Sequence, residues 1–406
     1  MVNSLISKKS LPATLYVLLF SLYTVAFSLH QNVQLIRFLY IPFYALSFWY
    51  MLKTLKYYFN ASYIKILTIL FLLILVYGTL LIVSGTDASW KRQTDPTNNL
   101  FLYVSSIIPL YAFYYFGRKK MLSTYWFQLM LVVFFADAYA LYYEKETTIM
   151  NMMSIEEGSF TNNTGYFFIS LLPMIVFFDK KKIIQYGTLI VISIFTILCF
   201  KRGAILVGIF AIFYFMVNEF KAKSGLKKIL VVAISAIVVS VLYQFVENLL
   251  LENDYFYYRL QSTAEGNSSG RDSLYSWFWN YYISEENGLL GLLLGNGAGA
   301  TIRIHGYEAH NDWLEIAINM GLLGIVVYIM YWATMFKYYR FAKKHLQNEI
   351  AIAMGMVLII NFSRTFFSMS LNGMSFFSAS LIGYTMSMVD CQLNMCTKNL
   401  VKNKKR

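Results

Sequence analysis

The feature that most constrains this chain is a succession of apolar runs, each long enough to cross a bilayer as a helix. We place twelve runs in the 406 residues, at 11–29, 34–52, 63–84, 98–116, 124–143, 164–178, 183–200, 203–218, 228–246, 313–336, 350–369 and 373–390. A segment inside a bilayer must satisfy its backbone polar groups internally, so these runs predict helices. The expected fold class is an all-α polytopic integral membrane protein with about 12 transmembrane helices and one long external loop.

The composition supports the same class. Hydrophobic residues make up 58% of the chain and charged residues 14%, whereas soluble domains average about 25% charged residues. A soluble fold of this length could not bury so much apolar surface. The first apolar run is long enough to span and others follow it, so we interpret it as a retained helix and not as a cleavable signal peptide.

The net charge of +13 is distributed in a way that indicates membrane topology and not nucleic-acid binding. With the N-terminus inside, 24 of the 34 lysines and arginines fall in cytoplasmic segments, around residues 8–9, 53–65, 118–120, 180–182, 221–228, 337–344 and 398–406. This alternation follows the positive-inside rule and predicts that both termini are cytoplasmic. We expect the lipid bilayer, and no nucleic acid, as a partner.

One long break interrupts the hydrophobic pattern, at residues 247–312, and we expect it outside the membrane. The predicted organisation is transmembrane helices one to nine (1–246), a large external or periplasmic loop with amphipathic helices (247–312), helices ten to twelve (313–390) and a basic cytoplasmic tail (391–406). No internal repeat relates the two halves, which counts against an alternating-access transporter.

Within the loop, residues 271–282 are predicted to form a helix with Asp272 or Ser273 as its N-cap. Its aromatic side chains would lie along the membrane interface, where aromatic belts are common; stacking against sugar rings is the functional alternative. The glycine-rich run 295–299 lacks the strand and helix that flank a dinucleotide-binding loop. We interpret it as a turn that lets the backbone approach a ligand or the membrane.

The end of the loop carries the strongest candidate for chemistry, His310, Asn311 and Asp312, just before the tenth apolar run. Asn311 or Asp312 is a good N-cap for that helix, and ending the loop is the plain alternative role. The positive end of a helix dipole disfavours imidazolium, and nearby arginines act in the same direction. A neutral imidazole is what a general base requires, so His310 is the candidate catalytic residue.

Several cations on the outer side are candidates for binding an anion. Lys201 and Arg202 lie in a very short turn between apolar helices, and Arg271 begins the aromatic helix. The planar fork of arginine suits a diphosphate, whereas contact with headgroups or nearby acids is the alternative. Arg259 is a third candidate and Arg303 a fourth.

Two further observations limit the chemistry. The cysteines Cys199, Cys391 and Cys396 have no metal-ligand spacing, so we expect neither a metal site nor a cofactor. Asp137 lies inside the fifth apolar run, where a carboxylate is a functional suspect. It would equally suit a structural position near the outer end, hydrogen-bonded to tyrosines.

In order, the motifs resemble those of the O-antigen polymerase and O-antigen ligase superfamily of bacterial envelope enzymes. They are a Lys-Arg-Gly turn (Lys201, Arg202), a late external loop with Gly-Arg and a tryptophan six residues on (Gly270, Arg271, Trp277), Gly-x-Gly (Gly295, Gly297), and His-Asn-x-x-Leu leading to Gly-Leu-x-Gly (His310, Asn311, Leu314, Gly321, Gly324). The motifs cover residues 201–324, and the topology extends the likeness to the whole chain. Lys201 departs from the Ser or Thr that the family often has there.

The resemblance implies a GT-C-like fold and glycosyl transfer from a polyprenyl-diphosphate donor, at the outer face of the bacterial cytoplasmic membrane. Arg202, Arg271 and Arg259 would bind the diphosphate, with Asn311, Asp312 and Lys201 in support, and His310 would deprotonate the acceptor hydroxyl.

The resemblance favours a polysaccharide polymerase that extends a lipid-linked repeat unit, with a chain-length regulator as a candidate partner. An O-antigen ligase that transfers glycan to lipid A core is the alternative within the class. A transporter of lipid-linked oligosaccharide is the alternative from another class.

Overall fold

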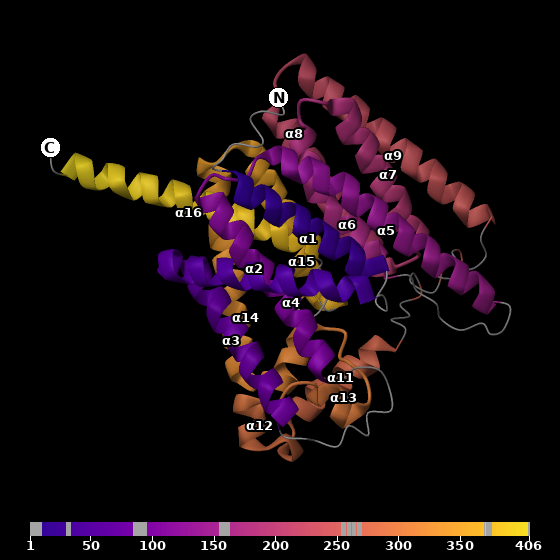
Figure 1. Ribbon diagram of the computed structural model, residues 1–406. Coiled ribbons are helices and arrows are strands. Elements are labelled where there is room, and N and C mark those ends of the chain that lie inside the picture. The colour runs from indigo at the N-terminus through magenta and orange to yellow at the C-terminus, as the bar shows by residue number, and fades with distance from the viewer. Residues whose placement is uncertain are drawn as a thin grey trace.

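The chain folds almost entirely into helices (Figure 1). The structure, a computed structural model, describes residues 10–29, 34–83, 96–153, 163–252, 257, 261, 265, 270–368, 370 and 376–404, and contains no strand within these ranges. The helices are α1 Leu11–Leu29, α2 Gln34–Tyr58, α3 Ser62–Val83, α4 Pro96–Arg118, α5 Thr124–Met153, α6 Gly165–Leu171, α7 Lys182–Leu198, α8 Arg202–Ala222, α9 Leu226–Glu252, α11 Arg271–Ile283, α12 Gly288–Leu294, α13 Ala300–His305, α14 Asp312–His345, α15 Asn348–Phe367 and α16 Phe376–Lys404, with 3₁₀ helices η2 Leu172–Phe178 and η3 Glu285–Asn287.

Each of the twelve predicted apolar runs overlaps a helix, and several helices extend beyond their run. Within the described residues, six helices are long and apolar enough to cross a membrane: Ser62–Val83, Thr124–Lys145, Arg202–Ala222, Leu226–Glu252, Asp312–His345 and Asn348–Phe366. Shorter apolar helices span Leu11–Ala26, Gly165–Phe178 and Lys182–Leu198. The predicted all-α multi-pass membrane class is therefore confirmed. α9 continues into the predicted loop, to Glu252, and α16 continues through the predicted tail, to Lys404.

Helices α4 and α16 pack closely through small residues. A Cβ atom on Gly383 would lie 2.5 Å from the carbonyl oxygen of Leu110, and one on Gly117 would lie 1.9 Å from the Ser387 hydroxyl. Inside a bilayer the hydrophobic effect does not drive helices together, so association depends on close backbone approach and interhelical hydrogen bonds. One such bond network joins Asp390 on α16 to the hydroxyls of Tyr114 and Tyr338, each at 2.7 Å.

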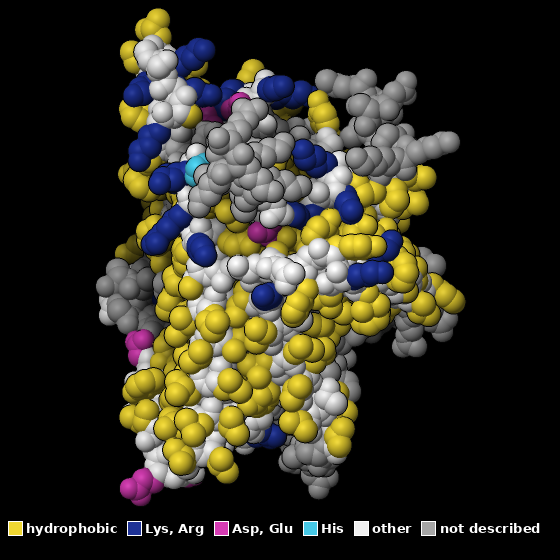
Figure 2. All heavy atoms as spheres, turned by 90° about the vertical axis from the view of Figure 1, so that its left-hand side faces the viewer, with side chains coloured by type: hydrophobic (Ala, Val, Ile, Leu, Met, Phe, Trp, Pro, Cys, Tyr) yellow, Lys and Arg dark blue, Asp and Glu magenta, His cyan; other side chains and the backbone are white. Residues whose placement is uncertain are grey.

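Basic side chains gather at the end of the molecule where α4 and α14 finish. Figure 2 shows lysines and arginines over the upper part of one face, above a broad hydrophobic area. Two of these cations lie over aromatic rings: Lys53 is 4.9 Å from the Trp49 ring centroid and Arg118 is 5.0 Å from that of Tyr58. Such contacts stabilise a cation at a partly desolvated surface.

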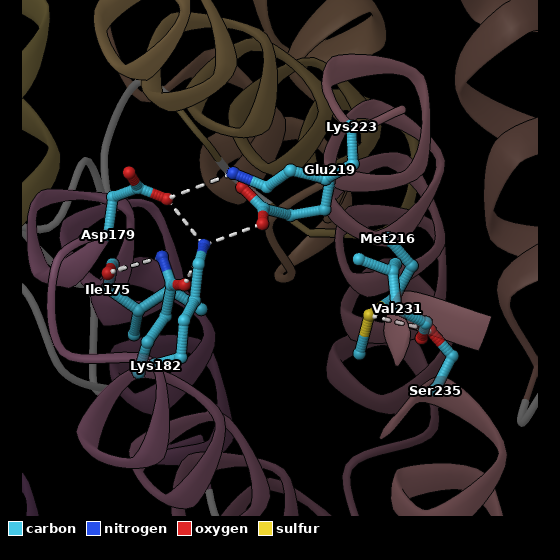
Figure 3. A network of polar contacts seen from close by, with 9 residues as sticks. Ile175, Asp179, Lys182, Met216, Glu219, Lys223, Val231 and Ser235 are labelled. Carbon is cyan, nitrogen blue, oxygen red and sulfur yellow. Dashed lines mark hydrogen bonds and ion pairs between the residues drawn. The ribbon is translucent and has the colours of Figure 1, made fainter. Parts of the chain in front are cut away.

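At this end, a polar network links the turn that precedes α7 with helix α8 (Figure 3). The Lys182 ammonium lies between two carboxylates, forming an ion pair with Asp179 and another with Glu219, 2.6 Å from its oxygen. Glu219 is buried near the end of α8. A buried carboxylate requires a paired partner, so this network holds the two helix ends together.

A compact cap, residues 270–311, lies at the opposite end from the basic side chains and contains α11, η3, α12 and α13 (Figure 1). α3 contacts it through the Tyr77 hydroxyl, which donates a hydrogen bond to the carbonyl oxygen of Leu294. The apolar side chains of α12, including Leu289 and Leu290, are exposed. Exposed apolar side chains here are expected for a cap that rests on a bilayer.

Candidate functional site

The candidate site is built around the start of α14, where the cap meets the bundle. Asn311 is the N-cap: its side-chain oxygen accepts hydrogen bonds from the backbone N–H groups of Trp313 (2.9 Å) and Leu314 (3.3 Å). Of the two predicted N-caps, Asn311 is therefore confirmed. Asp312 points into the protein and is buried, where its carboxylate accepts from the Tyr328 hydroxyl (2.7 Å) and the Ser370 N–H (3.0 Å).

α14 is broken at Gly321, which has φ 62° and ψ −159°. The glycine-rich turn of the cap fills the break: the N–H groups of Asn296 and Gly297 donate to the carbonyl oxygens of Ile318 (2.8 Å) and Asn319 (3.0 Å). These are carbonyls that the helix break would leave without partners. The first segment of α14, residues 312–320, is thus bonded to the cap.

The sequence predicts that the backbone of the turn 295–299 approaches a ligand or the membrane. In the structure this backbone does make a close approach, but its neighbour is the backbone of α14. A Cβ atom on Gly321 would lie 2.5 Å from the Gly295 nitrogen, and one on Gly295 would lie 2.4 Å from the Met320 nitrogen. Both glycines have positive φ, so glycine is required there for conformation as well as for space. Arg303 donates a hydrogen bond to the Asn296 carbonyl oxygen, which gives this fourth candidate cation a structural position in the cap.

His310 lies immediately before the N-cap and has a left-handed backbone with φ 51°. The Tyr275 hydroxyl lies within hydrogen-bonding distance of both the His310 carbonyl oxygen (3.1 Å) and the Phe366 carbonyl oxygen (3.2 Å). The imidazole keeps an exposed face. Partial burial, and after it the positive charges of Arg271 and Lys201, lower the pKa of His310 below its usual 6.5. The imidazole is therefore neutral at pH 7.

The predicted cations divide into two groups. The charges of Arg271, at the start of α11, and of Lys201, in the α7–α8 turn, both act on His310. Arg202 is half-buried at the first residue of α8, and Arg259 lies outside the described residues. Of the two cations in the α7–α8 turn, it is therefore Lys201 whose charge helps to lower the pKa of His310.

Two buried residues that the sequence interpretation did not choose extend this cluster inward. Arg364 on α15 is 4% exposed and Tyr166 on α6 is 3% exposed; the guanidinium carbon lies 4.9 Å from the ring centroid. The charge of Arg271 also reaches Tyr166, and that of Asp312 reaches Arg364. The sequence signal for Arg364 is a single arginine inside an apolar run. A charge inside a membrane is costly, so such residues are usually paired or functional.

A pair of acidic residues beside His310 was also missed. The Glu315 carboxylate is buried and accepts hydrogen bonds from the Thr301 hydroxyl (2.6 Å), the Asn319 amide (3.0 Å) and the Ala309 N–H (3.0 Å). These bonds fix the backbone that leads into His310. Burial, with the charge of Glu315, raises the pKa of the half-buried Glu308 to about 7.

The aromatic helix predicted at 271–282 is confirmed as α11, but its predicted N-caps are wrong. The N-cap is Gly270 at φ 77°, and the Ser273 hydroxyl instead donates to the Gly270 carbonyl oxygen at 2.8 Å. A left-handed residue at this position suits glycine. Trp277 packs on His305, with 4.4 Å between ring centroids, so part of this aromatic surface is used inside the cap. Asp137 is buried in α5, which packs against α1, α6 and η2.

No known family model matches the sequence, and no curated protein is similar enough to count as a relative. Function must therefore be inferred from the site itself. A neutral histidine beside two cations, at the boundary between cap and membrane bundle, can remove a proton close to a bound anion.

Proposed function

We propose that this chain is a membrane glycosyltransferase, a polysaccharide polymerase of the O-antigen polymerase and ligase type. It acts at the outer face of the bacterial cytoplasmic membrane, with twelve spans, a GT-C-like arrangement and both termini in the cytoplasm. The donor is a glycan on a polyprenyl diphosphate and the acceptor is a lipid-linked repeat unit. The observation that supports the proposal is that partial burial, together with the charges of Arg271 and Lys201, lowers the pKa of His310.

The reaction is a single displacement at the anomeric carbon of the donor. His310 takes the proton of the acceptor hydroxyl as its oxygen bonds to that carbon, and the bond to the diphosphate oxygen breaks. The electron pair leaves with the polyprenyl diphosphate, whose developing charge Lys201 and Arg271 stabilise. Arg202 and Arg259 are the further candidates for binding the diphosphate. One displacement inverts the anomeric configuration, so a product of retained configuration would contradict this route.

An apolar groove between membrane helices suits the hydrocarbon part of such a donor. It has a volume of about 160 Å³ and lies between α8, α14 and α15, with Tyr214, Tyr339, Phe362 and Ser363 among its walls. Ser363 immediately precedes Arg364 in α15. The backbone at Gly355 forms part of the wall, where a Cβ atom would lie 2.2 Å from the Tyr214 hydroxyl oxygen.

The test is glycan profiling of cells that lack this protein, complemented with wild type, His310→Ala or His345→Ala. His345 is an exposed histidine at the far end of α14 and is the matched control. We expect single repeat units on the surface core of the deletion strain, and long chains restored by wild type and His345→Ala but not by His310→Ala.

Two results would replace the polymerase assignment. Long chains that accumulate on the lipid carrier, with none on the core, would identify a ligase with lipid A core as acceptor. Full rescue by His310→Ala would reject the base role and favour a transporter of the lipid-linked oligosaccharide, because a transporter needs cations for the diphosphate but no general base.

A further inference from the structure

We infer that Arg364 and Tyr166 form an inner anion-binding position, which holds the lipid-side phosphate of the polyprenyl diphosphate while Arg271 and Lys201 hold the sugar-side phosphate. The inference rests on the proposed function for the identity of the ligand. It adds two residues on two helices that the motif pattern does not include.

The first observation is the depth and charge of the cluster. The charge of Arg271 reaches both the exposed His310 and the buried Tyr166, and the guanidinium carbon of Arg364 lies 4.9 Å from the Tyr166 ring centroid. Lys201, Arg271 and Arg364 supply three positive charges, and the charge of the buried Asp312 reaches Arg364. The Asp312 carboxylate accepts hydrogen bonds from Tyr328 and from the backbone of Ser370. Several arginine and lysine side chains around one position are what recognition of a phosphate uses.

The second observation is the Tyr166 hydroxyl. The residue is 3% exposed, Ser368 lies near its hydroxyl, and no described residue meets hydrogen-bonding geometry with that oxygen. A buried hydroxyl without a hydrogen-bond partner is unfavourable, because it has lost its bonds to water. A phosphate oxygen placed between Arg271 and Arg364 would accept its hydrogen bond, and hydrogen bonds to charged acceptors are the stronger kind.

The third observation decides which phosphate lies here. Ser363, the neighbour of Arg364, lines the apolar groove between α8, α14 and α15. His310, which must reach the acceptor hydroxyl at the anomeric carbon, lies at the other, exposed end of the cluster. A diphosphate that joins a sugar to a hydrocarbon chain therefore enters with its lipid-side phosphate at Arg364 and Tyr166.

The experiment measures binding of geranylgeranyl diphosphate to the full chain in phosphatidylcholine nanodiscs, for wild type, Arg364→Lys and Tyr166→Phe. Arg364→Lys keeps the charge but loses the planar fork. Tyr166→Phe keeps the ring against Arg364 and removes only the hydroxyl. We expect each variant to weaken binding by about tenfold, since hydrogen bonds to charged groups contribute about 1.5–3 kcal/mol. Binding of geranylgeranyl monophosphate should change less, because one phosphate can bind at Arg271 alone.

The matched controls are Arg118→Lys and Tyr58→Phe, which change a second arginine–tyrosine pair of the same geometry, with 5.0 Å between guanidinium carbon and ring centroid, at the basic end. Both should bind the diphosphate as wild type does. Wild-type affinity in Tyr166→Phe together with wild-type affinity in Arg364→Lys would overturn the inference; if Arg364→Lys does not fold, Tyr166→Phe decides. Equal affinity for inorganic diphosphate would reject the lipid-side assignment.

The outcome is separable from that of the proposed function. If wild type binds the lipid diphosphate through Arg364 and Tyr166 but transfers no glycan in the cellular assay, the anion position is retained and the polymerase function fails. If wild type transfers glycan while neither variant changes binding, the polymerase function is retained and the inner position fails.

Discussion

At the scale of single residues, the site depends on how charges around His310 set its protonation. The pKa of the imidazole is lowered by partial burial and by Arg271 and Lys201. In the proposed mechanism neutral His310 is the active form, so the rate of transfer should fall as the pH drops through this lowered pKa. The acid limb of the pH profile therefore lies below the ordinary histidine value of 6.5.

Lys201→Gln tests this electrostatic contribution. Removal of a positive charge makes imidazolium less unfavourable, so the pKa of His310 rises and the acid limb of kcat/KM moves to higher pH. The control is Lys223→Gln, which changes a lysine in the network at the basic end. Profiles are measured on purified protein with a lipid-diphosphate donor. An unchanged or downward-shifted acid limb in Lys201→Gln would contradict the assignment.

The raised pKa of Glu308 predicts that the stability of the protein depends on pH. Folding raises its pKa from 4.5 to about 7, so the native state holds a proton that the unfolded chain releases in this range. The stabilisation from Glu308 is complete below pH 4.5 and is lost as the pH rises through 7. The Tm of wild type should fall by a few degrees between pH 5 and pH 8, and that of Glu308→Gln should fall less. Parallel curves would show that Glu308 does not titrate in this range.

At the scale of elements, the broken helix α14 depends on two glycines that face each other. Gly321→Ala would place a Cβ atom 2.5 Å from the Gly295 nitrogen, at a positive φ. We expect a loss of about 2–3 kcal/mol in the free energy of unfolding, from steric overlap and backbone strain together. The measurement is Tm in nanodiscs, with Gly187→Ala in α7 as control, because nothing lies within 4 Å of its added Cβ. A Tm equal to that of wild type in Gly321→Ala would refute the role of this contact.

The elements were predictable from the sequence to different degrees. Apolar runs determine where helices form, and the preference of asparagine for helix N-termini identified Asn311. The break at Gly321 was not predictable, because it depends on hydrogen bonds from residues 296 and 297, more than twenty positions earlier in the chain. Arg364 and Tyr166 were missed for the same reason: each is one polar residue in an apolar run, and only packing of α6 against α15 brings them together. The predicted N-caps of α11, Asp272 and Ser273, were wrong because Gly270, in the left-handed conformation, occupies the N-cap position.

At the scale of the whole molecule, the distribution of charge predicts the orientation in the membrane. Basic side chains lie at one end and the cap at the other (Figures 1 and 2). Exposed Glu286, between α11 and α12, should lie outside the cell membrane, and exposed Lys227, in the first turn of α9, should lie inside. In a background with Cys199, Cys391 and Cys396 replaced, a membrane-impermeant maleimide added to intact cells should label Glu286→Cys and not Lys227→Cys. Labelling of Lys227→Cys alone would invert the topology and remove the site from the outer face.

The break in α14 also determines where the chain can be divided. Because the carbonyl groups of Ile318 and Asn319 are bonded to the cap, the nine residues that open this helix belong to the cap by their hydrogen bonds, although by sequence they begin a membrane span. A chimera that exchanges the cap for that of another protein would separate these bonded partners if its junction were placed at Asp312. A unit that keeps these bonded partners together runs from residue 270 through residue 320, so the boundary that these hydrogen bonds favour lies inside a helix.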